Sequence, residues 1–201
     1  VAIGSFKCEK GEWGSWANAE VFLRGWRAVN DDGRYRHHDW TIKVDADTVF
    51  YPDRFPMHMD KLQLTGDRSV FFMNFMPGYP VVGALEAVST IVLIAFFDQH
   101  FNECDDLAIG AAEDCWFWKC MERMGAEMIQ VGFYTTSSIH LLLRHHRSRG
   151  CIITALWDDS LLQHEGHPEG DKCTDGWFVA MHPFKTVGEY NACIDRQGFG
   201  T

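Results

Sequence analysis

Two carboxylates follow an apolar, β-branched segment one quarter of the way along the chain. Residues 40–44 predict a β-strand, and Asp45 and Asp47 come directly after it with one residue between them. Side chains at the end of a strand in an α/β sheet face the crevice where ligands bind. Hard divalent cations prefer carboxylate and phosphate oxygens, and such a cation can neutralise a diphosphate leaving group. The pair therefore indicates a metal and diphosphate site, although two acids in a turn after a strand also occur without any such role.

A second acidic pair, Glu113 and Asp114, opens a predicted helix over residues 113–124. A carboxylate in a cleft can act as the general base that takes a proton from an acceptor hydroxyl. The simpler explanation is that acids favour the first turn of any helix because of the helix dipole. The sequence leaves both interpretations open.

A histidine and a lysine follow a late apolar segment. Residues 177–181 predict a strand, His182 comes directly after it, and Lys185 lies three residues further on. Imidazole is a suitable third ligand for an ion such as Mn²⁺, and an ammonium group can meet a phosphate as a point charge. A structural histidine and a solvated lysine are the alternatives.

Gly83 and Ala84 lie at a predicted junction between a loop and a buried helix over residues 86–101. A glycine at such a junction permits the close approach of a ligand, although an ordinary loop needs one equally. We therefore take these two residues as candidates for substrate binding.

The elements that position these residues alternate between strands and helices. A helix is expected over residues 15–29, with Ser15 as its N-cap, and a shorter one over 55–64. Further strands are expected over 69–73 and 127–131. This alternation predicts an α/β fold in a single domain over residues 1–201. Residues 133–167 show no clear periodicity and are expected to form an insertion or a long loop.

Composition excludes some classes of protein. The 201 residues carry a formal net charge of -10, which argues against a general nucleic-acid binder. The most apolar stretch, residues 88–97, is shorter than the about 20 residues of a membrane-spanning helix. No signal-peptide pattern is present at Val1, so we expect no targeting signal and no membrane segment in this chain. The seven cysteines form no CxxC pair; they fit either disulfides with one free thiol or a set of reduced thiols.

Four motifs in a fixed order resemble one family. They are WTIKVDADTVF at residues 40–50, GALEAVS at 83–89, AAEDCWFWKCMERMG at 111–125 and WFVAMHPFK at 177–185. The series resembles the GT-A glycosyltransferases of the Fringe and mucin-type β-1,3-galactosyltransferase group. It is also similar to uncharacterised protist proteins with the same motif order. The resemblance covers residues 13–190 without the expected insertion.

The resemblance implies a GT-A-like mixed sheet flanked by helices and a role for each motif. Asp47 would bind Mn²⁺ or Mg²⁺ directly, Asp45 would contact the donor ribose or the water shell of the metal, and His182 would complete the metal site. Asp114 would be the catalytic base, with Glu113 beside it. The donor would be a nucleotide sugar, of the UDP type, and the acceptor a hydroxyl of a glycan or glycoprotein, with inversion at the anomeric carbon. The compartment would be the lumen of the Golgi or the ER.

Two other functions are compatible with these residues. GT-A domains carry most of their nucleotide-binding units before the DxD motif, whereas only 44 residues precede Asp45 here. The pocket for the base and ribose would then be abbreviated, trimmed away or supplied elsewhere. A degenerate transferase domain that binds sugars without turnover is therefore one alternative. The other is a haloacid-dehalogenase-like phosphatase, in which Asp45 would be the nucleophile and Asp47 the acid/base.

Overall fold

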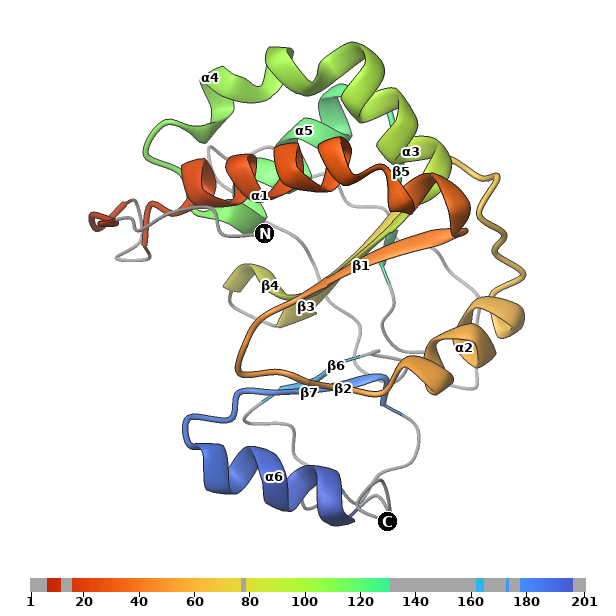
Figure 1. Ribbon diagram of the computed structural model, residues 1–201, viewed down its shortest axis with the longest axis vertical. Helices are drawn as coiled ribbons and strands as arrows, with labels where there is room; N and C mark the ends of the chain where they lie inside the picture. The colour runs from red at the N-terminus through yellow and green to blue at the C-terminus, as the bar shows by residue number, and fades with distance from the viewer. Residues whose placement is uncertain are drawn as a thin grey trace. The chain divides into compact units, whose positions relative to one another are not determined.

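The computed structural model describes residues 7–11, 16–76, 79–130, 162–164, 173 and 178–196 (Figure 1). Helices and strands alternate along the first two thirds of the chain, as the sequence predicts. In chain order the elements are α1 (Ala19–Asp32), η2 (Arg34–His37), β1 (Trp40–Val44), β2 (Val49–Phe50), η3 (Pro52–Arg54), α2 (Phe55–Lys61), β3 (Val70–Met76), β4 (Tyr79–Ser89), α3 (Thr90–Ala95), η4 (Phe96–His100), η5 (Phe101–Cys104), α4 (Asp105–Ala108), α5 (Glu113–Arg123), β5 (Glu127–Gln130), β6 (Leu162–His164), β7 (Ala180–His182) and α6 (Val187–Arg196).

The strands form two sheets. The larger has the order β1-β4-β3-β5, and the smaller has the order β2-β7-β6. In the smaller sheet β2 runs antiparallel to β7, whereas β6 runs parallel to it, so this sheet is mixed. The expected α/β class is therefore confirmed as a mixed α/β fold with a mixed sheet flanked by helices.

The chain divides into two compact units. The first comprises Val1–Thr41, Thr65–Phe72 and Ala87–Ile129, and the second comprises Ile42–Leu64, Met73–Glu86 and Gln130–Thr201. The boundary falls within β1, β3 and β4, so each of these strands contributes residues to both units. The two aspartates after β1 and the histidine at the end of β7 belong to the second unit.

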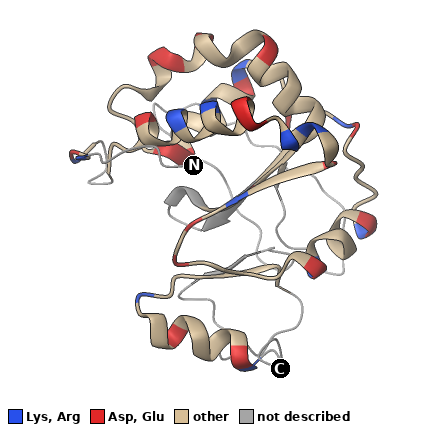
Figure 2. Cartoon of the chain, in the orientation of Figure 1, with Lys and Arg blue, Asp and Glu red and all other residues tan. Residues whose placement is uncertain are grey.

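An aromatic core fills the first unit. Trp26 of α1 stacks on Phe117 of α5, with ring centroids 4.9 Å apart, and Phe96 meets Phe117 edge to face. The exposed residues of α1 carry charges of both signs (Figure 2). The helix is therefore amphipathic, and burial of its aromatic face against α5 stabilises it more than helix propensity does.

Helix α1 begins later than the sequence predicts. Its N-cap is Asn18, not Ser15, which lies outside the described residues. The side-chain oxygen of Asn18 accepts a hydrogen bond from the backbone N–H of Glu113 at 2.9 Å, so it joins the start of α1 to the start of α5. Gly33 ends the helix with a φ of 73°, in the left-handed region that favours glycine.

The largest difference from the predicted elements is at residues 79–89. These residues form strand β4, whereas the sequence analysis assigned a loop to 81–85 and the start of a helix to Glu86. Every residue from Ala84 to Ser89 is buried. A strand covered on both faces shows no alternation, so its apolar run cannot be distinguished from a buried helix by periodicity. Helical structure begins only at Thr90, after Ser89 as an N-cap with extended backbone.

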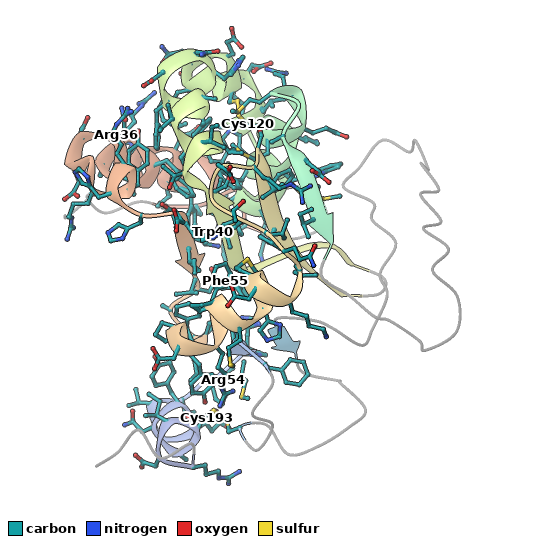
Figure 3. All side chains as sticks on the ribbon, turned by 90° about the vertical axis from the view of Figure 1, so that its right-hand side faces the viewer. Arg36, Trp40, Arg54, Phe55, Cys120 and Cys193 are labelled. Atoms are coloured by element: carbon teal, nitrogen blue, oxygen red, sulfur yellow. A yellow bond between two sulfur atoms is a disulfide. The ribbon has the colours of Figure 1, made fainter. Side chains whose placement is uncertain are left out.

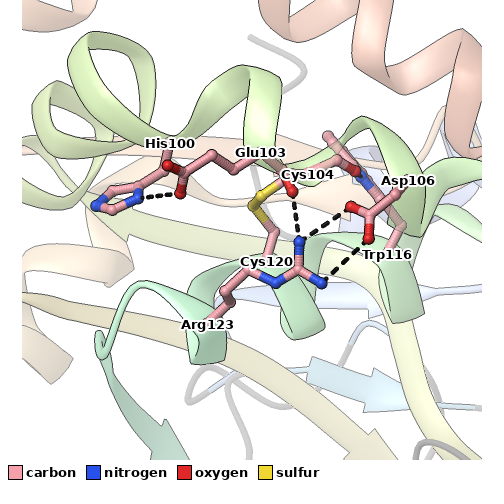
Figure 4. The surroundings of a disulfide bond; sticks show 7 residues. All are labelled: His100, Glu103, Cys104, Asp106, Trp116, Cys120 and Arg123. Atoms are coloured by element: carbon pink, nitrogen blue, oxygen red, sulfur yellow. Dashed lines mark hydrogen bonds and ion pairs between the residues drawn. A yellow bond between two sulfur atoms is a disulfide. The ribbon is translucent and has the colours of Figure 1, made fainter.

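Disulfides reinforce both units. Cys104 and Cys120 join η5 to α5 in the first unit, and Cys173 and Cys193 tie α6 in the second. Cys115 is also disulfide-bonded, and among the described cysteines Cys8 is free. Beside the Cys104–Cys120 bond, the guanidinium of Arg123 donates hydrogen bonds to Asp106 and to the carbonyl oxygen of Glu103 (Figure 4). The bond is thus buried beneath a polar surface network.

The second unit has a small core between α6 and the smaller sheet. It contains Val49, Tyr51, Cys173, Phe178, Met181, Phe184 and Cys193. Arg54, labelled in Figure 3, donates a hydrogen bond to the carbonyl of Phe178 at 2.7 Å and lies 4.1 Å from the centroid of the Tyr51 ring. These contacts hold the segment after β2 against the segment that enters β7.

Two expectations concern segments of the chain rather than single elements. Of residues 133–167, the expected insertion or long loop, only β6 lies within the described residues. No helix in the described part of the chain is long and apolar enough to cross a membrane.

The Cys104–Cys120 bond is expected to contribute strongly to stability. It closes a loop with a sequence separation of 16, and cross-linking a loop of that size lowers the entropy of the unfolded chain. Replacing both cysteines with alanine should lower the free energy of unfolding by about 3 kcal/mol. Guanidinium unfolding under non-reducing conditions measures the change. Cys8→Ala is the matched control, and an equal loss in that variant would contradict the assignment.

Candidate metal and anion site

The two aspartates lie in a tight turn between β1 and β2. The backbone N–H of Thr48 donates to the carbonyl of Asp45 at 3.0 Å, which closes the turn. The carbonyl oxygen of Ala84 in β4 accepts two hydrogen bonds, from the N–H of Asp45 at 3.1 Å and from the hydroxyl of Thr48 at 3.3 Å. Thr48 is only 3% exposed, so this anchor is shielded from water. These hydrogen bonds fix the conformation of the turn without any contribution from the aspartate side chains.

Strand β7 brings the late motif to the same turn. Val49 of β2 pairs with Met181 of β7, and Phe50 pairs with Ala180. Beyond the end of β7, the N–H of Phe184 donates to the carbonyl of Asp47 at 2.9 Å. Backbone hydrogen bonds thus hold the segment after β7 alongside the turn, and His182 and Lys185 flank it.

Asp45, Asp47 and His182 form a cluster of possible metal ligands. One donor atom from each lies within 4.8 Å of the other two. His182 Nε2 is 3.2 Å from Asp47 Oδ1, and the two side chains are 13% and 30% exposed. The structure therefore brings together three residues that belong to motifs far apart in the sequence.

Two lysines neutralise the two aspartates. Lys43 Nζ lies 2.9 Å from Asp45 Oδ1, and Lys185 Nζ forms a short ion pair with Asp47 Oδ2. In Figure 2 a basic residue in β1 is followed by acidic residues in the connection to β2. The charges in the cluster are thus balanced by the protein itself.

The pKa of Asp47 reflects these contacts. Partial burial of the carboxyl raises its pKa, but the hydrogen bond from Lys185 and the electrostatic influence of His182 and Lys185 lower it. Together they bring the pKa below the ordinary value of 3.8. Asp47 is therefore ionised at neutral pH, as a metal ligand must be.

The donor set fits a hard divalent cation. Two carboxylates and one imidazole suit Mn²⁺ better than a soft ion, which would prefer thiolates. Mg²⁺ is compatible with the carboxylates and is bound through few protein ligands. Asp45, Asp47 and His182 would hold the ion, and the remaining positions would be open to water or to an anionic ligand.

The other predicted site residues belong to β4 and α5. Gly83 and Ala84 are part of β4 and do not form a junction between a loop and a helix, because the helix begins only at Thr90. The side chain of Ala84 is buried, while its carbonyl oxygen anchors the aspartate turn. Glu113 and Asp114 lie in the first turn of α5, in the first unit. Glu113 is buried, and Asp114 is half-buried and accepts a hydrogen bond from the N–H of Cys115 at 2.7 Å.

The sequence analysis missed Lys43 and Thr48. In a strand, residues two apart lie on the same face, so Lys43 and Asp45 were candidates for contact from their spacing alone. Thr48 follows the second aspartate directly, where a hydroxyl often hydrogen-bonds within a turn. The hydrogen bond from Thr48 to the carbonyl of Ala84, in contrast, could be found only once β1 and β4 were known to be neighbouring strands.

Comparison with known proteins does not identify a family. The sequence matches no protein-family model and has no significant match among curated proteins. Function must therefore be argued from the site itself.

The lowered pKa of Asp47 predicts a pH-dependent contribution to stability. A carboxyl whose pKa is lower in the folded than in the unfolded chain stabilises the fold above the unfolded value, and this stabilisation is lost as pH falls through the folded value. Asp47→Asn should therefore lower the free energy of unfolding at pH 7 by about 1 kcal/mol. The difference from wild type should shrink as the pH falls below 3.8.

Urea unfolding at pH 7 and pH 3, in the presence of a chelator, tests this expectation. Asp53→Asn, which removes an exposed carboxylate from the same unit, controls for the loss of one charge. A difference between Asp47→Asn and wild type that stays constant across this range would contradict the ion-pair assignment.

Proposed function

We propose that this chain is the catalytic domain of a metal-dependent glycosyltransferase of the GT-A type. It would transfer a sugar from a nucleotide-diphosphate donor to a hydroxyl of a glycan or glycoprotein. The observation that carries the proposal is the cluster of Asp45, Asp47 and His182, with donor atoms within 4.8 Å of one another. The cluster adjoins a lysine that is largely exposed. This combination can bind a divalent cation and a diphosphate together.

The chemistry of the site suits the departure of a nucleoside diphosphate. A bound Mn²⁺ or Mg²⁺ would supply Lewis-acid stabilisation to the leaving diphosphate. Asp47 and His182, which touch each other, would hold the ion directly. Asp45, tied to Lys43, would contact the donor ribose or the water around the ion. Lys185 would add a positive charge for the diphosphate.

Three further features support the GT-A assignment. The aspartates end a strand of a mixed α/β fold, where such folds bind ligands. The short strand after them pairs with the strand that carries His182, which brings the first and the last of the four motifs together. Disulfides persist in oxidising compartments, so the Cys104–Cys120 and Cys173–Cys193 bonds support a setting in the Golgi or ER lumen.

The geometry favours a glycosyltransferase over a phosphatase with an aspartyl nucleophile. In the phosphatase mechanism Asp45 forms the phospho-enzyme. That mechanism assigns no role to a histidine in contact with Asp47. The glycosyltransferase mechanism uses all three members of the cluster. A phosphatase of this type also needs a further acidic pair. Asp105 and Asp106, which could serve as that pair, are engaged in ion pairs with Arg27 and Arg123.

Binding of UDP should depend on the metal and on Asp47. With Mn²⁺ present, calorimetry of the wild-type chain should show UDP binding, and without Mn²⁺ the affinity should fall sharply. Asp47→Ala should remove the metal-dependent part, with a loss of at least about 100-fold, because loss of even an outer-shell partner costs about 10- to 100-fold. His182→Ala should act in the same direction.

Asp53→Ala is the matched control for these variants, since it removes an exposed aspartate from the same unit. If all variants bind UDP equally well and without metal, the chain is better described as a binding module without transferase activity. Covalent capture of Asp45 by a phosphate analogue would favour the phosphatase instead.

Asp114 is proposed as the general base for the acceptor hydroxyl. It is the more accessible of the two acids in the first turn of α5. Asp114→Asn should lower kcat by about 10²- to 10⁴-fold and leave the affinity for UDP unchanged, because a general base acts only on proton transfer. Release of UDP from a panel of UDP-sugars measures kcat. Glu122→Gln, an exposed acid on the same helix, is the control, and an equal loss there would argue against a specific role for Asp114.

A further inference from the structure

The two lysines of the site differ in their freedom to move. The side chain of Lys43 is 12% exposed, whereas that of Lys185 is 70% exposed. Lys43 also projects from strand β1, while Lys185 lies in the irregular segment after β7. The ammonium group of Lys43 is thus held beside Asp45. The ammonium group of Lys185 can move away from Asp47 by rotation about the bonds of its four-carbon side chain.

Lys185 and a divalent cation would need the same carboxylate. Its ammonium contacts Asp47 Oδ2, while His182 Nε2 lies 3.2 Å from the other oxygen of that carboxylate. A cation bound between Asp47 and His182 would therefore meet a positive charge already in contact with its ligand. Like charges a few ångströms apart repel strongly, even when solvent screens part of the interaction.

The backbone next to Lys185 is fixed, and only its side chain is free. The N–H of Phe184 donates to the carbonyl of Asp47 at 2.9 Å, which keeps the α-carbon of the next residue beside the turn. The α6 helix begins at Val187, two residues beyond Lys185. A displaced ammonium group would therefore remain within reach of whatever binds the metal.

We propose that Lys185 is a resident counter-ion of Asp47 that a divalent cation displaces and that then pairs with the anionic group bound to that cation. This inference rests on the metal site of the proposed function. It assigns two opposite effects to one side chain. Lys185 weakens the binding of the free cation, and it strengthens the binding of a diphosphate that arrives with the cation.

The first half of the exchange is tested with Mn²⁺ alone. Lys185→Met removes the competing charge and should bind Mn²⁺ about five- to thirty-fold more tightly than wild type, as judged by loss of the free-ion electron paramagnetic resonance signal. The gain should shrink at high salt, because exposed charges are screened. Lys185→Arg retains the charge and should bind Mn²⁺ like wild type.

The second half is tested with inorganic pyrophosphate at saturating Mn²⁺. Here Lys185→Met should bind the anion about five- to thirty-fold more weakly than wild type. Lys119→Met, which changes the net charge equally at an exposed lysine of α5, should match wild type in both measurements. Because Lys185 is exposed, these variants are expected to fold normally.

The outcomes separate this inference from the function on which it rests. If wild type binds Mn²⁺ and Lys185→Met binds it no more tightly, Lys185 does not compete with the cation. The proposed displacement is then wrong, while the proposed metal site is supported. If Lys185→Met gains affinity for both Mn²⁺ and pyrophosphate, the side chain only repels the metal, and the exchange is wrong again. If wild type and Asp47→Ala bind Mn²⁺ equally, or neither binds it, the proposed metal site and the exchange fall together.

Discussion

The site depends on hydrogen bonds, most of them between main-chain groups, that fix both ends of the short turn between β1 and β2. Ala84 in β4 holds the beginning of the turn through the N–H of Asp45 and the hydroxyl of Thr48, and Phe184 holds its end through the carbonyl of Asp47. Because backbone groups make most of these bonds, the positions of the two carboxylates follow from strand pairing. The side chains remain available for ions. A site built in this way keeps its shape when the charges on it change.

The electrostatics of the site follow from that arrangement. Asp45 and Asp47 extend from a fixed turn, and each carboxylate would repel the other if both were left without cations. Lys43 and Lys185 balance these charges, and the side chain of Lys43 is largely buried whereas that of Lys185 is exposed. The difference in burial gives the cluster one permanent ion pair and one that can exchange. The same pattern explains how Asp47 can stay ionised although it is partly buried.

Sequence patterns located much of the fold because several elements bury only one face. Strand β1 was predicted closely from its β-branched and aromatic residues, and helix α5 from apolar residues at helical spacing. Strand β4 was missed because its residues 84–89 are buried on both faces, so their apolar residues show no alternation that distinguishes a strand from a helix. Ser15 was chosen as the cap of α1 from its residue type, but Asn18 takes that position through its bond to the N–H of Glu113, a tertiary contact. In the candidate site, Asp47 and His182 were each identified as possible ligands from their residue types. That the two side chains are in contact follows only from the pairing of β2 with β7.

The pairing of β2 with β7 also sets when the site can form during synthesis. Val49 and Phe50 leave the ribosome long before Ala180 and Met181, so the turn must wait for most of the chain before its partner strand arrives. Pairing of such distant segments also has to overcome the entropy of closing a long loop, which slows its formation. A nascent chain would carry two aspartates but no histidine beside them. The cluster of Asp45, Asp47 and His182 therefore exists only once β7 has been made and has paired with β2.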